Sequence, residues 1–205
     1  QGIVTDVVSA DVTDNAALKK IFSDLDAQHI PVRGVLHAAG VNWFSKVLNL
    51  ENKTFFNTLN IKVSASWALH QLTQERDLDC FILFSSVSSL WGSVDLSHYT
   101  AANHFMDMLS HYRAAAGLPV TTINWGPWAE VGMSASENVT GVLHQLGFNL
   151  LHPDVALQAM ETALVNKTEL SLIASINWQK FRPFINFSLQ PSLFNKVIDA
   201  VSKTT

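Results

Sequence analysis

The residues best suited to chemistry lie in and around the stretch 81–103. A short apolar run ends in two hydroxyls, Ser85 and Ser86, and a helical pattern then brings Tyr99 and Asn103 four residues apart. Positions i and i+4 share one face of a helix. Side chains at the carboxyl end of a buried strand reach the edge where ligands of open α/β sheets bind. A serine hydroxyl and the Tyr99 phenol are therefore expected to share one small polar pocket.

The elements that must position these side chains alternate between strand and helix, which predicts a parallel βαβ sheet. We expect strands at residues 3–12, 32–37, 81–85, 120–125 and 170–174. The expected helices begin after Thr13 or Asp14, which are N-cap candidates, and then cover residues 50–72, 97–116 and 153–165, with a short helical turn at 178–184. The stretch that follows Trp128 is expected to be less regular.

The composition is that of one globular α/β domain. Its 205 residues suffice for a sizeable core, and its 48% apolar and 15% charged residues lie far from the disordered regime. The net charge is -4 and the sequence has no basic cluster, so nothing in it indicates the positively charged surface that nucleic-acid binding requires. No apolar run reaches bilayer length, no signal peptide is visible, and the single Cys80 cannot form an internal disulfide. We expect a cytoplasmic protein without membrane or nucleic-acid partners.

Five short motifs then occur in a fixed order. They are Ala-Asp-Val-Thr-Asp at 10–14, His-Ala-Ala-Gly at 37–40, Leu-Phe-Ser-Ser at 83–86, Tyr-Thr-Ala-Ala-Asn at 99–103 and Trp-Gly-Pro-Trp at 125–128. Together they resemble the ketoreductase domain of modular polyketide synthases, in the short-chain dehydrogenase/reductase superfamily. The resemblance implies a Rossmann-like parallel sheet with flanking helices. Residues 1–187 would be the C-terminal part of the ketoreductase domain, and residues 188–205 a tail or linker.

One part of the family pattern has no match in the sequence. The family places a Gly-rich phosphate-binding loop before the Asp11 strand, and no G-x-G-x-x-G motif follows a strand here. In a Rossmann sheet the strands of that unit would lie between the first and second strands of this chain. The Asp11 strand would then lack a neighbour to pair with. We expect a fold that is incomplete at its N-terminus, with the N-terminal part of the same ketoreductase and neighbouring synthase domains as partners.

The resemblance assigns catalysis to four residues: Lys62, Ser86, Tyr99 and Asn103. Most of the superfamily has a lysine four residues after the tyrosine. Here Asn103 takes that place and Lys62 comes from the preceding helix, an exchange characteristic of polyketide ketoreductases. Ser85 competes with Ser86 for the serine role, and the thirteen-residue step to Tyr99 favours Ser86.

These residue types suit the reduction of a ketone. Hydride delivered to a carbonyl carbon leaves negative charge on oxygen, which the Ser86 hydroxyl can stabilise. The Tyr99 phenol can supply the proton only if a cation stabilises its phenolate, because a tyrosine pKa lies near 10. Lys62 would be that cation and would also hold the cofactor ribose. Asn103 would orient Lys62 or a relay water.

The resemblance implies NADPH as the cofactor. The matching positions are Asp11, Val12, Ala38, Ala39, Gly40, Gly126 and Pro127, together with Lys62 and Tyr99. The first two match the adenine contacts, the Ala-Ala-Gly turn matches the loop beside the adenosine ribose, and the Gly-Pro pair matches the turn that meets the nicotinamide amide. Tight packing at strand ends is the alternative interpretation of the small residues.

The resemblance also bears on stereochemistry. Trp91, eight residues before Tyr99, marks the A-type class, which gives the L-configured alcohol. Residues 41–43 do not carry the Leu-Asp-Asp motif of B-type domains, and Leu96 stands where epimerising domains have a histidine. Residues 125–133 resemble a lid over the substrate, which would place Trp128 and Met133 beside it.

The resulting hypothesis is NADPH-dependent reduction of a β-ketoacyl thioester, carried on the phosphopantetheine arm of an acyl carrier protein, to a β-hydroxyacyl thioester in polyketide biosynthesis. The alternative is a redox-silent domain kept for structure, carrier-protein binding or epimerisation, which the intact catalytic four disfavour. His104, Asp107 and His111 share a helix face at a spacing that could bind a metal. No partner ligands are indicated for that face, and no metal is expected.

Overall fold

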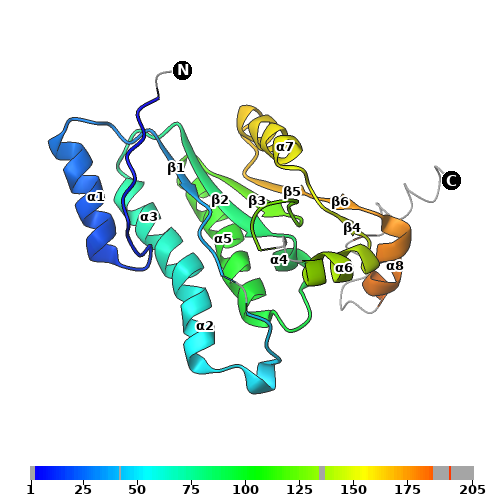
Figure 1. Cartoon of the computed structure of the whole chain (residues 1–205). Helices are drawn as coiled ribbons and strands as arrows, with labels where there is room; N and C mark the ends of the chain where they lie inside the picture. The colour runs from blue at the N-terminus through cyan, green and yellow to red at the C-terminus, as the bar shows by residue number, and fades with distance from the viewer. Residues whose placement is uncertain (1–2, 42, 134–136, 187–193, 195–205) are drawn as a thin grey trace.

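A four-stranded parallel sheet forms the centre of the molecule (Figure 1). The computed structural model describes residues 3–41, 43–133, 137–186 and 194. The strand order is β1-β2-β3-β5, with β1 (Gly34–His37), β2 (Cys80–Ser86), β3 (Thr121–Trp125) and β5 (Leu170–Ile173). A short antiparallel pair, β4 (Phe148–Asn149) with β6 (Ser175–Ile176), lies beyond the end of this sheet. The expected parallel α/β sheet is confirmed.

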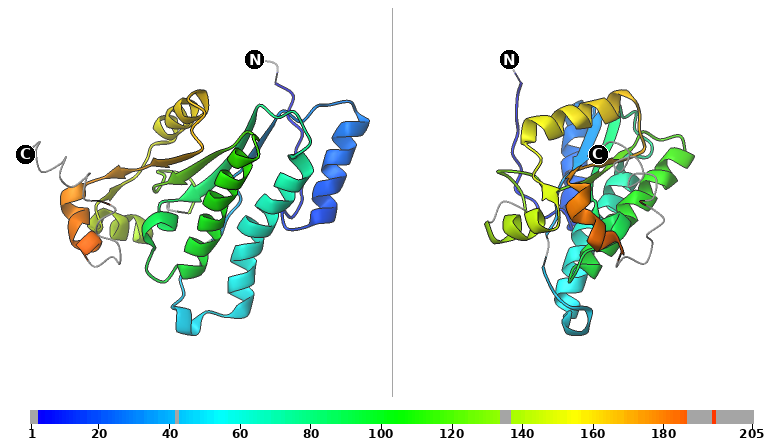
Figure 2. Two further views of the ribbon diagram at one scale, coloured as in Figure 1. Left: turned by 180° about the vertical axis from the view of Figure 1, so that it is seen from behind. Right: turned by 90° about the vertical axis from the view of Figure 1, so that its right-hand side faces the viewer.

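Helices cover the sheet on both faces (Figure 2). One face carries α1 (Asn15–Ala27), α3 (Ala65–Thr73) and α5 (Ser97–Ala115), and the other carries α7 (Pro153–Val165). The other helical segments are η1 (Val47–Asn49), α2 (Asn52–Leu59), η2 (Asn60–Ser64), α4 (Ser88–Trp91), α6 (Glu137–Gln145) and α8 (Trp178–Asn186). The segments α2, η2 and α3 follow one another without a break and confirm the helix expected over residues 50–72.

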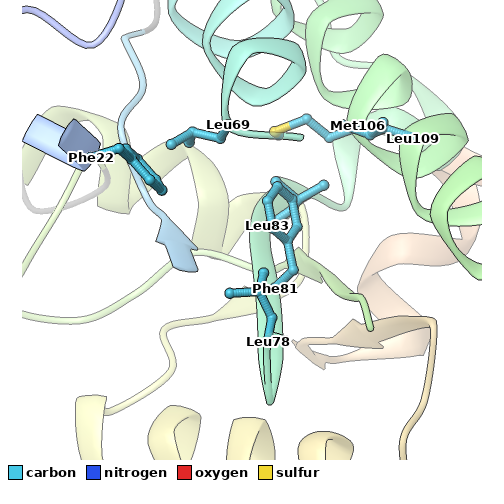
Figure 3. Close-up of a cluster of buried hydrophobic side chains, with 7 residues drawn as sticks. All are labelled: Phe22, Leu69, Leu78, Phe81, Leu83, Met106 and Leu109. Carbon is cyan, nitrogen blue, oxygen red and sulfur yellow. The ribbon is translucent and has the colours of Figure 1, made fainter. Parts of the chain in front are cut away.

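The larger hydrophobic core lies between β2 and the helices on its α5 side (Figure 3). Alternate strand residues face opposite sides of a sheet, so Phe81 and Leu83 point toward the helices, and both are fully buried. They meet Phe22 from α1, Leu69 from α3, and Met106 with Leu109 from α5, next to Leu78. The core therefore fixes α5 against β2, the two elements that carry Ser86 and Tyr99.

The strand expected at residues 3–12 is wrong. Residues 3–11 have no regular secondary structure and are exposed, and Ile3, Val4 and Val7 are each more than 85% accessible to solvent. A strand exists only when a neighbour accepts its backbone hydrogen bonds, and no described strand pairs with this segment. Regular structure begins at α1, where the Asp14 carboxylate caps the helix by accepting from the N–H groups of Ala16 and Ala17.

Two further differences concern the C-terminal half. The stretch expected to be irregular contains α6, whose pattern is obscured by Gly141 inside the helix, since an interior glycine lowers helix propensity by about 1 kcal/mol. The predicted tail at 188–205 lies outside the described residues except for Phe194. Across the described ranges, no helix is both long and apolar enough to cross a membrane.

Leu83 provides a test of this core. Leu83→Ala removes a fully buried side chain from between β2 and the α5 side, and we expect the free energy of unfolding to fall by about 2–5 kcal/mol. Leu157→Ala is the matched control because Leu157 is 48% exposed on α7, and its effect should stay within about 0.5 kcal/mol. Urea unfolding followed by tryptophan fluorescence measures both, and equal losses would contradict the assigned core.

Candidate active site

The carboxyl ends of β1, β2 and β3 meet at one edge of the sheet. The register aligns His37 with Leu83 and Ser86 with Trp125. The Ala-Ala-Gly turn at 38–40, the Ser85-Ser86 pair and the Gly126-Pro127 turn therefore follow the strand ends side by side. This is the edge at which ligands of open α/β sheets bind.

Ser86 is held by the turn that leads from β2 into α4. Its Oγ accepts a hydrogen bond from the Ser88 N–H at 3.2 Å and another from the Ser88 hydroxyl at 3.0 Å. Because a hydroxyl has one proton to donate, the Ser86 proton is left for a different acceptor. Ser86 is only partly buried, whereas the Ser85 hydroxyl is buried and donates to the Asn103 carbonyl at 3.2 Å. Of the two serines, Ser86 is therefore the one placed to meet a ligand.

Tyr99 and Asn103 lie one turn apart on α5, as their spacing predicted, and both are buried. The Asn103 amide donates to the Tyr99 carbonyl at 2.8 Å. The Asn103 Oδ1 atom is buried and has no hydrogen-bond partner among the described residues. That oxygen is available to accept from a water or from an ammonium group, which is what the role predicted for Asn103 requires.

Lys62 lies in the middle of η2, a π-helical turn between α2 and α3. Such turns widen a helix by one residue and are frequent at functional sites. Only 3% of Lys62 is exposed, and its Nζ donates to the Phe84 carbonyl at 3.0 Å while lying 5.7 Å from the centre of the Tyr99 ring. The structure thus brings the lysine from the preceding helix to the tyrosine.

Gly40 makes room for this lysine. A Cβ atom at position 40 would lie 3.1 Å from Lys62 Cε and 3.3 Å from its Nζ, which is tighter than ordinary contact. Met133 Cε would be 4.0 Å away. The glycine at the end of the Ala-Ala-Gly turn therefore has a packing reason, whether or not a cofactor also approaches it.

Burial sets the proton affinities in the site. It lowers the pKa of Lys62 to about 8, and the charge of Asp107 opposes this shift. It raises the pKa of Tyr99, and the neighbouring Ser86 and Asn103 side chains partly offset this rise. Burial, with the neighbouring Lys62 charge, lowers the pKa of His37 to about 4. At neutral pH the site therefore holds a protonated lysine beside a neutral phenol and a neutral imidazole.

The remaining cofactor positions have structural partners of their own. Asp11 is exposed, and its Oδ1 accepts from the Thr13 N–H and hydroxyl at 2.8 Å each, which lowers the Asp11 pKa. A Cβ at Gly126 would lie 2.8 Å from the Ala174 Cβ, so tight packing accounts for this glycine. Val12, Ala39 and Gly40 are partly buried, Ala38 is exposed and Pro127 is buried. Contacts with NADPH stay a prediction for all of them.

Trp91 packs into an aromatic cluster. Its ring lies 5.5 Å from Phe181, 6.3 Å from Phe148 and 5.4 Å from Phe194. Trp91 is the last residue of α4, which begins two residues after Ser86. The cluster therefore ties α8 to the segment that holds the serine, and a stereochemical role of Trp91 stays a prediction.

The proposed lid begins as an anchored segment. Trp128 forms a parallel bridge with Leu151, and its ring lies 4.9 Å from that of Trp125. Met133 is 43% exposed, and Leu96 is buried just before α5. Residues 134–136, which would continue the lid, and Asn42, in the segment compared with the Leu-Asp-Asp motif, lie outside the described residues.

Two buried polar residues lie beneath the site: Asn124, which no motif indicated, and Asp107, which was considered only with His104 and His111 as a possible metal-binding face. Asp107 is 1% exposed and Asn124 is fully buried in β3, and the Asn124 amide lies 3.0 Å from both Asp107 carboxylate oxygens. The signal was present, since Asp107 follows Tyr99 by eight residues and hence shares its helix face, and Asn124 is a polar residue inside an apolar strand. Asp107 points inward while His104 and His111 are exposed, and the described residues contain no group of three side chains that could hold a metal.

An open hollow also lies between α1, α3 and α5. Its lining includes Val63, Trp67 and Phe105, and it contains none of the four predicted catalytic residues. Since it has no ionisable side chain, we place the chemistry at the strand ends instead.

Comparisons with known proteins agree with this geometry. A family model described as the KR domain matches residues 1–130. The chain is 33% identical to mycoketide-CoA synthase of Mycobacterium tuberculosis over 98% of its own length, which is 5% of that protein. It is 34% identical to the polyketide synthase GfsA of Streptomyces halstedii over 89% of its length, which is 2% of that protein. The chain thus spans a small part of these relatives.

Solved structures of ketoreductases are also similar to this chain. An A1-type ketoreductase superposes with a TM-score of 0.83 at 33% identity, covering 86% of this chain and 37% of that one. The ketoreductase from the first module of phoslactomycin biosynthesis in Streptomyces sp. HK803 gives a TM-score of 0.81 at 35% identity, over 86% and 41% of the two chains.

The buried lysine gives the site a pH signature. The folded-state pKa of Lys62, about 8, lies below its ordinary value of 10.5, so the unfolded state binds more protons between these pH values. Stability should therefore rise with pH through this window, while below about pH 8 the full cost of burying the ammonium is present. The raised pKa of Tyr99 makes the stability of the folded state fall with rising pH, but only above about pH 10.

Urea unfolding from about pH 8 to about pH 10 measures this slope. In Lys62→Met the rise contributed by the lysine should disappear. Lys19→Met, which removes an exposed lysine of α1, should keep it. An unchanged slope in Lys62→Met would show that Lys62 is not buried as a cation.

Proposed function

Because this chain belongs to the KR domain family, the ketoreductases of modular polyketide synthases, we propose that it carries the catalytic residues of a β-ketoacyl-thioester reductase. The main support is the convergence of Lys62 and Tyr99 at the strand ends, with Nζ 5.7 Å from the ring centre. The substrate would be a β-ketoacyl group on the phosphopantetheine arm of an acyl carrier protein. Its product would be the β-hydroxyacyl thioester, made in the cytoplasm during polyketide biosynthesis.

Each residue has a distinct task in this reaction. The Ser86 hydroxyl, which the turn holds through the bonds that its Oγ accepts from Ser88, donates a hydrogen bond to the substrate carbonyl oxygen and stabilises the charge that develops there. The Tyr99 phenol gives its proton to the same oxygen. The Lys62 ammonium lowers the energy of the resulting phenolate. The unpaired Asn103 Oδ1 accepts from a water that returns a proton toward the tyrosine.

NADPH is the proposed cofactor and supplies the hydride when bound. Lys62 and Tyr99 would hold its nicotinamide ribose, and the turns at 38–40 and 126–127 would flank it. The buried Asn103 Oδ1 and His37 Nε2, which lack partners among the described residues, fit a site that receives a polar ligand. None of the described helices begins with a Gly-rich loop, so we propose that another part of the ketoreductase cradles the phosphates.

We also propose where that part attaches. β1 is an edge strand of the described sheet, with Gly34 and Leu36 exposed, and the apolar segment that includes Ile3 and Val7 pairs with none of the described strands. A Gly-rich strand-helix unit from the same ketoreductase would pair along β1 and give these residues a neighbour. Residues 1–187 would then be the C-terminal part of the ketoreductase domain. Residues 188–205 would link it to neighbouring synthase domains.

Tyr99→Phe tests the reaction. In the synthase polypeptide that carries this chain, NADPH consumption with a β-ketoacyl thioester should fall about 10²–10⁴-fold because the proton donor is lost. Tyr112→Phe makes the same chemical change at a 56% exposed position of α5 and should leave the rate unchanged. Equal rates for Tyr99→Phe and the parent protein would reject the mechanism. No reduction by the parent itself would favour the redox-silent alternative.

The stereochemical type is a separate proposal. Trp91 and the likeness to structures described as A-type support an L-configured alcohol. Chiral chromatography of the product from an unsubstituted β-ketoacyl thioester should show that isomer in excess. A D-configured product would overturn the A-type proposal and leave the assignment of the four catalytic residues intact.

A further inference from the structure

Asp107 is a buried carboxylate that the proposed reaction does not use. It lies on α5 one turn after Asn103 and two turns after Tyr99, with 1% of its surface exposed. None of the ion pairs found among the described residues includes it. Burying a charge without a close counter-charge is costly. Its burial one and two turns along α5 from the predicted catalytic residues therefore needs a physical explanation.

Asn124 holds this carboxylate in place. The Asn124 amide nitrogen lies 3.0 Å from each carboxylate oxygen, 3.1 Å from Ser85 Oγ and 2.6 Å from Ser89 Oγ. Ser85 in turn donates to the Asn103 carbonyl at 3.2 Å. This cluster joins β2, β3, α4 and α5 beneath the site. It fixes where the negative charge lies relative to the residues in front of it.

Lys62 is the cation that faces this charge. Its direct polar partner is the neutral Phe84 carbonyl. Three titratable groups of the described structure interact with it: His37 from β1, and Tyr99 and Asp107 from α5. His37 is neutral at pH 7 because its pKa is about 4, and burial keeps the Tyr99 phenol neutral. Asp107 is therefore the one charge among them that favours the ammonium, and it raises the pKa of Lys62 against the effect of burial.

We propose that Asp107 is a positioning residue: its buried carboxylate, fixed by Asn124, is the remote counter-charge that keeps Lys62 in the cationic form required to stabilise the Tyr99 phenolate. The catalytic consequence rests on the proposed function, whereas the charge coupling belongs to the fold. Charges in a buried layer interact beyond hydrogen-bond distance because little water screens them. Because Asp107 and Lys62 form no direct ion pair in the described structure, the carboxylate occupies none of the lysine donors.

Asp107→Asn is the first test because it removes the charge and nearly keeps the shape. Lysine is labelled with ¹³C, and the Lys62 Cε resonance, assigned by its loss in Lys62→Met, is followed against pH. The Lys62 pKa should fall from about 8 by about one unit, a tenfold change in the protonation equilibrium. If the amide disturbs the cluster, Asp107→Ser removes the same charge with a smaller side chain and should give the same direction.

Ser85→Ala is the control for a purely structural role. It removes a hydroxyl from the same cluster, together with the bonds to Asn124 and Asn103, but it keeps the carboxylate. The Lys62 titration should therefore stay where it is in the parent. An unchanged Lys62 pKa in Asp107→Asn, or an equal shift in Ser85→Ala, would overturn the proposal.

A second readout separates this proposal from the proposed function. In the synthase polypeptide, the alkaline limb of the rate profile should move to lower pH in Asp107→Asn, by the same amount as the Lys62 titration. A rate that falls uniformly at all pH values would indicate structural damage and contradict the electrostatic role. If Tyr99→Phe were fully active, the proposed reaction would fail while the Lys62 titration would still report the charge coupling.

Discussion

The ammonium of Lys62, buried against the Phe84 carbonyl and the Tyr99 ring, is the interaction on which the rest of the site depends. A buried cation is unfavourable, and the surrounding structure accommodates it in several ways. The π-helical turn presents the side chain, Gly40 leaves space for it, and the Phe84 carbonyl of β2 accepts a hydrogen bond from the ammonium. As a result, the positive charge of the Lys62 ammonium is held close to the Tyr99 phenol.

The end of β2 positions both a helix and the two serine hydroxyls. Its apolar face fixes α5 through the core, and its last two residues divide between structure and chemistry. Ser85 is buried and joins the polar cluster with Asn124, whereas Ser86 is only partly buried at the end of the strand. Alternation along one strand thus gives neighbouring hydroxyls opposite roles, and the same rule places Thr122 and Asn124 of β3 on one side and Ile123 with Trp125 on the other.

The sequence predicts the local parts of this arrangement well and the non-local parts poorly. The four catalytic candidates come from the family resemblance, and local spacing accounts only for the shared face of Tyr99 and Asn103 on α5 and for Ser86 at the end of β2. The strand expected at 3–12 failed because pairing depends on a neighbour that the residues themselves do not encode. The π-helical turn cannot be read from apolar periodicity, since it shifts the register by one residue only. Asp107 was grouped with His104 and His111 because spacing alone does not show which side of α5 faces β3.

The aromatic cluster at Trp91 affects how such domains can be recombined. Phe194 lies beyond the boundary predicted at residue 187, yet it is buried against Trp91 and Trp178. A chimaeric synthase joined at residue 187 would replace one wall of this cluster with foreign sequence. Because α4 runs directly from the turn after Ser86 to Trp91, a poorly matched junction would shift the Ser86 hydroxyl from its position. A splice site placed after the last aromatic residue of the cluster keeps the whole unit in its own context.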